Sequence, residues 1–167
     1  MIDDSASMKQ HWGNVHKVFE TLSYMVKEVD PNGFDLWFTG PGKPLKNQKH
    51  TTESLRTVEY RTKQGTTDIN DKLQKIFDDY VEALKKPKSV VRAKFSKAVK
   101  PLSLYVLTDG VWEQDCNPAH LVETFVKQLE DLGKVKGNLG VQFISFGEDP
   151  IGLGRMEFLD SGLNVNM

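Results

Sequence analysis

The sequence predicts an α/β fold with a largely parallel sheet, and two observations lead to this prediction. Several segments repeat apolar residues at helical spacing, and short apolar runs rich in β-forming residues lie between them. Alternation of this kind is typical of parallel strands joined by crossover helices. The chain has 167 residues, which suits one domain with its own hydrophobic core rather than two.

The first half of the chain begins with an amphipathic helix over residues 12–29, which the turn sequence Asp30-Pro31-Asn32-Gly33 ends. A short strand is expected at residues 34–38 (FDLWF), and a polar loop containing Gly and Pro at residues 40–50. Residues 51–62 fit either a short helix or a strand.

The second half opens with a helix over residues 68–84, and Pro87 follows it. The clearest strand covers residues 102–107 (LSLYVL). Asn117-Pro118 is typical of an N-cap followed by proline at the first helical position, so the next helix is expected from Pro118 to near Gly133. A strand at residues 141–146 and a short helix at residues 151–159 complete the expected order.

Composition excludes several classes of protein. Lys and Arg number 22 against 23 Asp and Glu, so net charge gives no support to nucleic-acid or membrane-surface binding. The single cysteine, Cys116, cannot form a disulfide within the chain. No apolar run approaches the roughly 18 residues that a membrane span needs, and no secretory signal is present at the start. The sequence therefore indicates an intracellular, cytoplasmic protein or part of one.

Oxygen-bearing side chains occur in three segments that the predicted fold brings to the sheet edge. These segments are Asp3-Asp4-Ser5-Ala6-Ser7-Met8, then Gly65-Thr66-Thr67-Asp68, and finally Thr108-Asp109-Gly110 directly after the clearest strand. Parallel α/β sheets form their ligand sites at the carboxyl ends of the strands. We therefore expect these three segments to build one site.

The same segments carry a family resemblance. Asp-x-Ser-x-Ser near the start, a later Gly-x-Thr and a strand ending in Thr-Asp-Gly resemble the metal-ion-dependent adhesion site of von Willebrand factor type A domains. The stretches IDDSASM, FDLWF, GTTDINDKL and PLSLYVLTDG look like the intracellular members of that family common in fungi. The resemblance implies one domain over residues 1–167, with a Rossmann-like three-layer sandwich in which helices flank a mostly parallel central sheet.

The resemblance also implies a metal and a partner. The ion would be Mg²⁺ or Mn²⁺, and the site residues would be Asp3, Ser5, Ser7, Thr67 and Asp109. In the family the hydroxyls bind the metal and the two aspartates mainly hold coordinating waters. Neutral hydroxyl oxygens suit a hard ion such as Mg²⁺. An Asp or Glu carboxylate from a partner protein would then complete the coordination, so the implied function is protein binding rather than catalysis.

The chain departs from the family pattern at several points. Ala6 replaces the usual glycine, and Asp4 occupies the variable position, where we expect an exposed side chain. Thr66 competes with Thr67 as the ligand, but Thr67 lies six residues before Leu73, which is the family's spacing. Against the family pattern the first and last strands are truncated, so both ends of the domain are expected to be incomplete. In the family the first strand lies in the middle of the sheet, in the strand order 3-2-1-4-5-6. An isolated chain without this middle strand is expected to be marginally stable or prone to aggregation.

Four further acids are expected on loops at the same edge of the sheet: Glu113, Asp115, Glu148 and Asp149. They would shape the surface that meets the partner, but the simpler interpretation is that they are ordinary solvated acids of loops. The stretch from Lys85 to Lys100 carries seven cations and no acid. An acidic partner could bind it, and a solvated loop between a helix and a strand is the simpler interpretation.

Other chemistries receive less support from the sequence. Cys116 follows Asp115, whose negative charge would raise the pKa of the thiol, and the four histidines lack zinc-type spacing. A metal-dependent hydrolase remains an alternative, but no second pair of acids supplies a general base. A scaffold with an unused site is the other alternative, and the complete set of motif residues argues against it.

Overall fold

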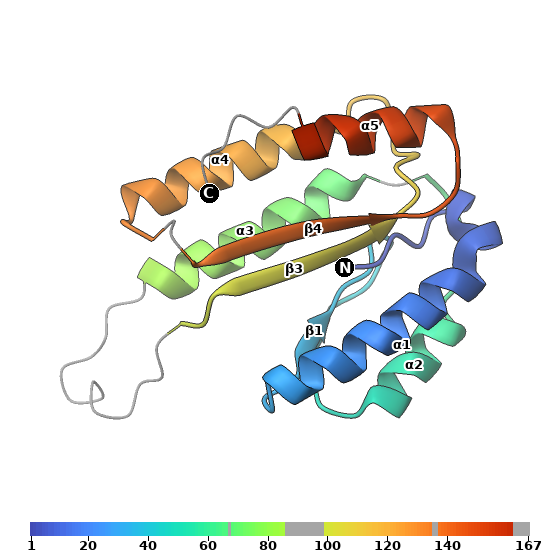
Figure 1. Ribbon diagram of the computed structural model, residues 1–167, viewed down its shortest axis with the longest axis horizontal. Helices are drawn as coiled ribbons and strands as arrows, with labels where there is room; N and C mark the ends of the chain where they lie inside the picture. The colour runs from blue at the N-terminus through green and yellow to red at the C-terminus, as the bar shows by residue number, and fades with distance from the viewer. Residues whose placement is uncertain (67, 86–98, 135–136, 162–167) are drawn as a thin grey trace.

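The computed structural model describes residues 1–66, 68–85, 99–134 and 137–161. The described helices are α1 (Trp12–Val29), α2 (Thr51–Glu59), α3 (Ile69–Lys85), α4 (Pro118–Asp131) and α5 (Pro150–Ser161), and a 3-10 turn, η1 (Ser7–His11), precedes α1. The described strands are β1 (Phe34–Leu36), β2 (Leu45–Gln48), β3 (Leu102–Thr108) and β4 (Leu139–Ser145). Figure 1 shows their arrangement, which confirms a mixed α/β fold.

Most elements begin and end close to the predicted residues. Helix α1 has the predicted bounds, and the ambiguous segment after residue 50 is the helix α2. At the start of α4, the Asn117 side chain accepts a hydrogen bond from the His120 backbone N–H and Pro118 occupies the first turn, so the predicted N-cap is confirmed. Helix α1 and the N-cap of α4 were predictable because periodicity and capping are local properties of the sequence.

The expectation of a polar loop over residues 40–50 was wrong in part, because this segment contains β2. Strand β2 pairs antiparallel with β1, so the strand pairing is not uniformly parallel. Three of the four side chains of β2 are polar, so this strand lacks the alternation of apolar and polar residues that predicts a strand. Leu45 packs against the core with α1 and α2, and the Asp35 carboxylate accepts hydrogen bonds from the Asn47 backbone N–H and from Lys46, both at 2.9 Å.

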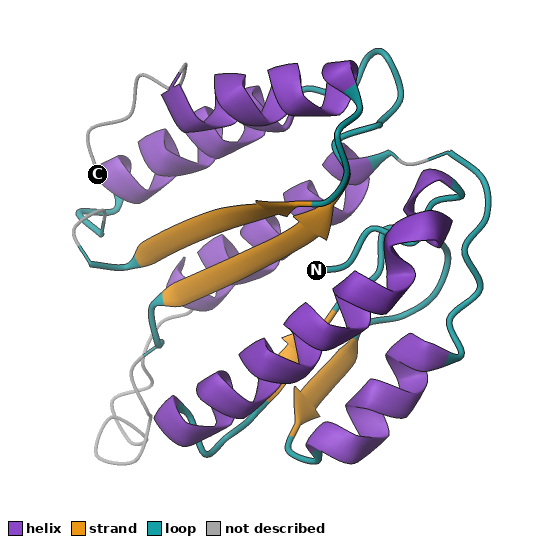
Figure 2. Cartoon of the chain, turned by 45° about the vertical axis from the view of Figure 1, so that its right-hand side comes forward, coloured by secondary structure: helices purple, strands orange, loops and turns teal. Residues whose placement is uncertain are grey.

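Strands β3 and β4 form a parallel ladder of seven residue pairs, from Leu102 opposite Leu139 to Thr108 opposite Ser145. Figure 2 shows the two strands side by side, with helices around them. Helix α4 follows β3 and helix α5 follows β4, as expected for crossover connections.

The start of the chain lies between the two pairs of strands. Ile2 forms parallel bridges to Phe38 on one side and to Leu107 on the other. Its backbone N–H donates to Trp37 O at 2.9 Å, and Thr39 N–H donates to Ile2 O at 3.1 Å. The family resemblance led us to expect that most of a middle strand is missing, but the backbone of residues 1–3 still forms hydrogen bonds to segments on both sides.

Neighbouring residues of the strands pack into two different cores. Met1, Trp37 and Val106 belong to a core formed with α3 and α4, whereas Ile2 and Leu107 belong to a core formed with α1 and α2. Successive side chains of a strand point to opposite faces of a sheet. The helices α3 and α4 therefore cover one face of these strands, and α1 and α2 cover the other.

Most of the basic stretch lies outside the described residues, because residues 86–98 are not among them. Within the part of the chain that the structure describes, no helix has the length and apolar character needed to cross a membrane.

Candidate functional site

Parallel pairing brings Asp3 and Asp109 to the same edge of the strands. The Asp3 backbone N–H donates to Leu107 O at 2.9 Å, and Leu107 N–H donates to Met1 O at 3.0 Å. Residue 3 therefore lies beside the end of β3, and Asp109 directly follows that strand. Both aspartates are buried, with exposed fractions of 0% for Asp3 and 4% for Asp109.

The Asp3 carboxylate is oriented by hydrogen bonds to both of its oxygens. Oδ1 accepts the Ser5 backbone N–H at 3.0 Å, and Oδ2 accepts the Thr108 hydroxyl at 2.8 Å. Thr108 is fully buried, and its hydroxyl also accepts from Trp112 Nε1 at 2.9 Å and from the Gly110 N–H at 3.1 Å. Sequence reasoning assigned no role to Thr108, although it stands in the Thr-Asp-Gly motif.

The two serines of the motif lie against each other. Their hydroxyl oxygens are 3.0 Å apart, with Ser5 buried and Ser7 half-buried at the start of η1. Between them, the Ala6 backbone N–H donates to Gly65 O at 3.0 Å, which joins the motif to the segment before α3. The structure thus brings together Asp3, both serines and the segment that leads to the expected threonine.

Thr67 lies outside the described residues, so the choice between the two threonines is open. Its neighbour Thr66 is exposed, and its hydroxyl donates to the Glu113 carboxylate at 2.5 Å. This contact joins the loop before α3 to the loop after β3. Glu113 is therefore the predicted loop acid that the structure connects most directly to the site.

The other predicted loop acids have varied surroundings. Asp115 and Glu148 are exposed. Asp149 accepts hydrogen bonds from the Ile151 N–H at 2.9 Å and the Gly152 N–H at 3.2 Å. Asp149 therefore caps the start of α5, which gives it a structural role.

Helix α5 holds the loop that carries Asp109. Arg155 donates from Nη1 to Gly110 O at 3.0 Å and Trp112 O at 2.9 Å, and from Nη2 to Glu113 O at 3.2 Å. Asp109 itself accepts the Val111 N–H at 3.0 Å. Nothing in the local sequence indicated Arg155, because its three acceptors are backbone atoms far away in the chain.

The expectation that Asp4 is exposed was wrong. Only 4% of Asp4 is exposed, and its carboxylate accepts hydrogen bonds from Arg61 Nε at 2.5 Å and the Gly40 N–H at 2.6 Å. Burial of a charge requires a partner of opposite charge or strong hydrogen bonds. Arg61 is that partner, and it lies 57 residues away in the sequence.

The expected donor set consists of hydroxyl and carboxylate oxygens, which is the donor type that a hard divalent ion takes. Oxygens bound to Mg²⁺ at about 2.1 Å and at right angles to each other are about 3.0 Å apart. The two serine oxygens are also 3.0 Å apart, but this is the length of the hydrogen bond between their hydroxyls and does not by itself indicate an ion. Among the described residues no three His, Cys, Asp or Glu side chains form a metal-binding group. The expected set contains only two carboxylates, so it depends on its hydroxyls.

Cys116 lies beside the same loops but is poorly suited to be a nucleophile. Burial raises the pKa of its thiol, and the neighbouring Asp68 carboxylate, 3.4 Å from the sulfur, acts in the same direction. A raised pKa lowers the fraction of reactive thiolate at neutral pH.

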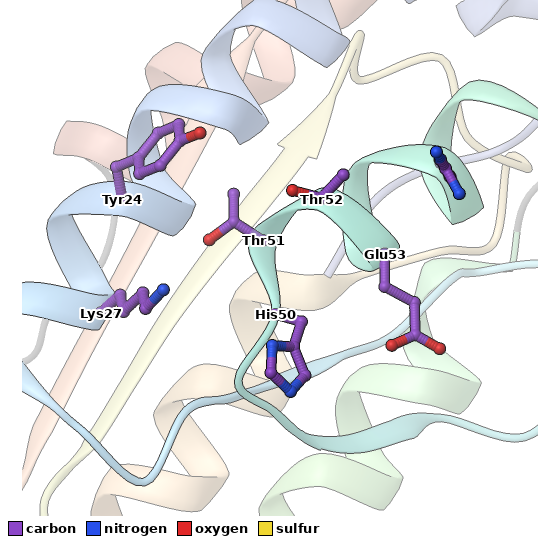
Figure 3. Close-up of a pocket in the computed structure, with 7 residues that line it drawn as sticks. Tyr24, Lys27, His50, Thr51, Thr52 and Glu53 are labelled. Carbon is purple, nitrogen blue, oxygen red and sulfur yellow. The ribbon is translucent and has the colours of Figure 1, made fainter.

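A separate groove of about 580 Å³ lies between the end of α1 and the start of α2 (Figure 3). Its lining residues are Tyr24, Lys27, His50, Thr51, Thr52, Glu53 and Arg56. Lys27 is near the end of α1 and the serine motif precedes its start, so a rise of 1.5 Å per residue separates the two places by roughly 20 Å along the helix. The groove is therefore not part of the candidate site.

Comparison with known protein families and with characterised proteins finds no match to this chain.

Proposed function

We propose that the protein is a metal-dependent protein-binding domain of the von Willebrand factor A type. Ser5, Ser7 and Thr67 would bind Mg²⁺ or Mn²⁺, and Asp3 and Asp109 would hold its coordinating waters. The observation that carries this proposal is that the two serine hydroxyls of the motif are hydrogen-bonded to each other beside the buried Asp3 carboxylate, which itself accepts the Ser5 backbone N–H.

The hydrogen bonds of Asp3 support a role in holding water. Both of its oxygens already accept protein hydrogen bonds, from the Ser5 N–H and the Thr108 hydroxyl, so the carboxylate has a fixed orientation. Groups that orient the ligands and waters of a metal tune its affinity. An ion bound mainly through neutral hydroxyls keeps much of its positive charge, and an Asp or Glu carboxylate of a partner protein would then complete its coordination.

The surrounding fold is proposed to be a Rossmann-like sandwich with residues 1–3 in the position of its middle strand. The alternation of Met1 and Ile2 between the two cores supports this arrangement. The spatial sequence β2, β1, residues 1–3, β3, β4 also agrees with the first five positions of the strand order 3-2-1-4-5-6, which the family resemblance implies. An intracellular location, as the single cysteine suggests, belongs to the same proposal.

Calorimetric titration of Mg²⁺ and Mn²⁺ into metal-free protein tests the metal site. We expect saturable binding, and we expect Asp109→Asn to weaken it roughly 10- to 100-fold, since groups around a metal have effects of this size. Asp115→Asn is the matched control, because it removes an exposed acid of the same loop between β3 and α4. If the folded wild-type chain binds neither Mg²⁺ nor Mn²⁺, the proposed metal site is wrong and the alternative of a scaffold with an unused site is favoured.

The partner chemistry needs a second measurement. Peptides from a random library are retained on the Mn²⁺-loaded protein and released with EDTA. We expect every retained family of peptides to share an Asp or Glu at one position, and retention to disappear in the Asp109→Asn variant. Retention that persists without metal would contradict binding of the partner through the ion.

A further inference from the structure

Asp4 is a buried carboxylate that accepts hydrogen bonds from Thr39, Gly40 and Arg61, none of which belongs to the proposed set of metal-site residues. Its Oδ1 accepts from the Gly40 N–H at 2.6 Å and the Thr39 hydroxyl at 3.0 Å. Its Oδ2 accepts from Arg61 Nε at 2.5 Å. Each oxygen of Asp4 thus has a partner on another segment, although the residue stands between Asp3 and Ser5 in the motif.

Arg61 connects Asp4 to a turn of the chain. While Nε donates to Asp4, Nη2 donates to Pro41 O at 2.8 Å, and the guanidinium lies 4.4 Å from the centre of the Phe38 ring. The Arg61 side chain is 25% exposed and the Asp4 side chain 3% exposed. A planar guanidinium that donates from two nitrogens in fixed directions imposes geometry as well as charge.

The segment that begins at Arg61 runs beside the metal-binding motif. Gln64 N–H donates to Asp4 O at 3.2 Å, and Ala6 N–H donates to Gly65 O at 3.0 Å. This segment leads directly to Thr66 and Thr67. The motif with the two serines and the segment with the third hydroxyl ligand are therefore joined at Asp4 and at Ala6.

We propose that the Asp4–Arg61 ion pair is a positioning device for the metal site, an inference that rests on the proposed function. The pair fixes the serine motif relative to the segment that leads to Thr67. Arg61 acts through Asp4 and touches no ligand of the metal itself.

Two substitutions of Arg61 separate geometry from charge. Arg61→Lys keeps the positive charge but cannot donate in the same two fixed directions, and Arg61→Gln removes the charge. Lys46→Gln is the matched control, because it breaks an exposed ion pair with Asp35 on the same half of the chain. Gly40→Ala is a milder variant: its Cβ would lie 2.9 Å from both Asp4 oxygens, which displaces the carboxylate without removing any charge.

The first readout is the dissociation constant for Mn²⁺, measured beside the melting temperature of each variant. Positioning predicts roughly tenfold weaker Mn²⁺ binding in both Arg61 variants, a loss typical of second-sphere groups, and unchanged binding in Lys46→Gln. If the charge of Arg61 alone mattered, Arg61→Lys would bind like the wild type and Arg61→Gln would bind more tightly. Either of those results, or a lower melting temperature with unchanged Mn²⁺ affinity, overturns the proposal.

The second readout is amide hydrogen exchange in the metal-free protein, which does not depend on metal binding. We expect the Ala6 and Gln64 amides to exchange faster in both Arg61 variants and in Gly40→Ala, and not in Lys46→Gln. Unchanged exchange at both amides overturns the positioning role. If the wild type binds no metal, the proposed function fails, and the exchange data still decide whether Asp4 and Arg61 join the two segments.

Discussion

The hydroxyl of Thr108 uses its full hydrogen-bonding capacity at the edge of the site. It donates to Asp3 and accepts from the Trp112 indole and the Gly110 backbone, at distances between 2.8 and 3.1 Å. A hydroxyl has one donor and two acceptor positions, so a side chain of the same shape without the oxygen leaves three buried groups without this partner.

Thr108→Val tests this role of a single residue. We expect a loss of about 1–3 kcal/mol in the free energy of unfolding, because buried polar groups would lose their partner. Urea denaturation measures the loss. Thr108→Ser retains the hydroxyl and should keep most of the stability; a valine variant as stable as the wild type would show that the hydroxyl contributes nothing.

At the scale of elements, helix α5 approaches the loop after β3 more closely than any side chain permits. Gly110 has φ of 76°, and a Cβ at Gly152 would lie 2.0 Å from the backbone oxygen of Asp109. The obstructing atom belongs to the backbone, so rotation of a side chain cannot relieve the overlap. Gly110 and Gly152 therefore allow α5 to pack directly against the loop after β3, to which Arg155 donates its hydrogen bonds.

Gly152→Ala is expected to destabilise the protein by about 1–3 kcal/mol or more, because it overpacks a close backbone contact. Gly154→Ala, two residues along in the same helix, is the control, since a Cβ there meets nothing within 4 Å. Alanine favours a helix over glycine by up to about 1 kcal/mol, so this control should be neutral or stabilising. Thermal melts that rank the two variants in the opposite order would contradict the close approach.

At the scale of the whole molecule, an ion pair joins the end of α1 to the approach to β3. Lys100 Nζ lies 2.6 Å from both oxygens of Asp30, and the two residues are 70 positions apart. The hydrogen bond from Lys100, with a further one from the Asn32 backbone, lowers the pKa of Asp30 to about 2. The Asp30–Lys100 pair connects the C-terminal end of α1 to the residues before β3, whereas the candidate site lies near the start of α1 and the end of β3.

This lowered pKa predicts a dependence of stability on pH. Because the folded-state pKa lies below the unfolded value of 3.8, the contribution of Asp30 is present above about pH 4 and is lost as the pH falls toward 2. The wild type should therefore lose more stability than Asp30→Asn over this interval, by a small amount that salt reduces. Melting temperatures between pH 5 and 2 measure the difference.

Asp79→Asn is the control for that series, since it breaks an exposed ion pair with Lys75 inside one helix. If the wild type and Asp30→Asn lose stability in parallel down to pH 2, the Asp30–Lys100 pair does not contribute to folding.

Much of the local structure was predictable. Helix α1, the N-cap at Asn117 and the strands β3 and β4 follow from periodicity, capping residues and apolar runs, which are properties of neighbouring residues. Strand β2 was not predictable in this way, because its residues are polar and its pairing depends on β1 and on the side chain of Asp35.

The sequence by itself determined the helices α1, α3, α4 and α5, the strands β1, β3 and β4, and the motif residues Asp3, Ser5, Ser7 and Asp109. Only the tertiary structure decided that residues 1–3 pair with strands on both sides, that Thr108 and Arg155 support the site, and that Asp4 is buried against Arg61. The physical reason is the same in each case. These contacts join residues distant in the chain, and a polar side chain has the same local sequence signal whether water or a distant partner satisfies its hydrogen bonds.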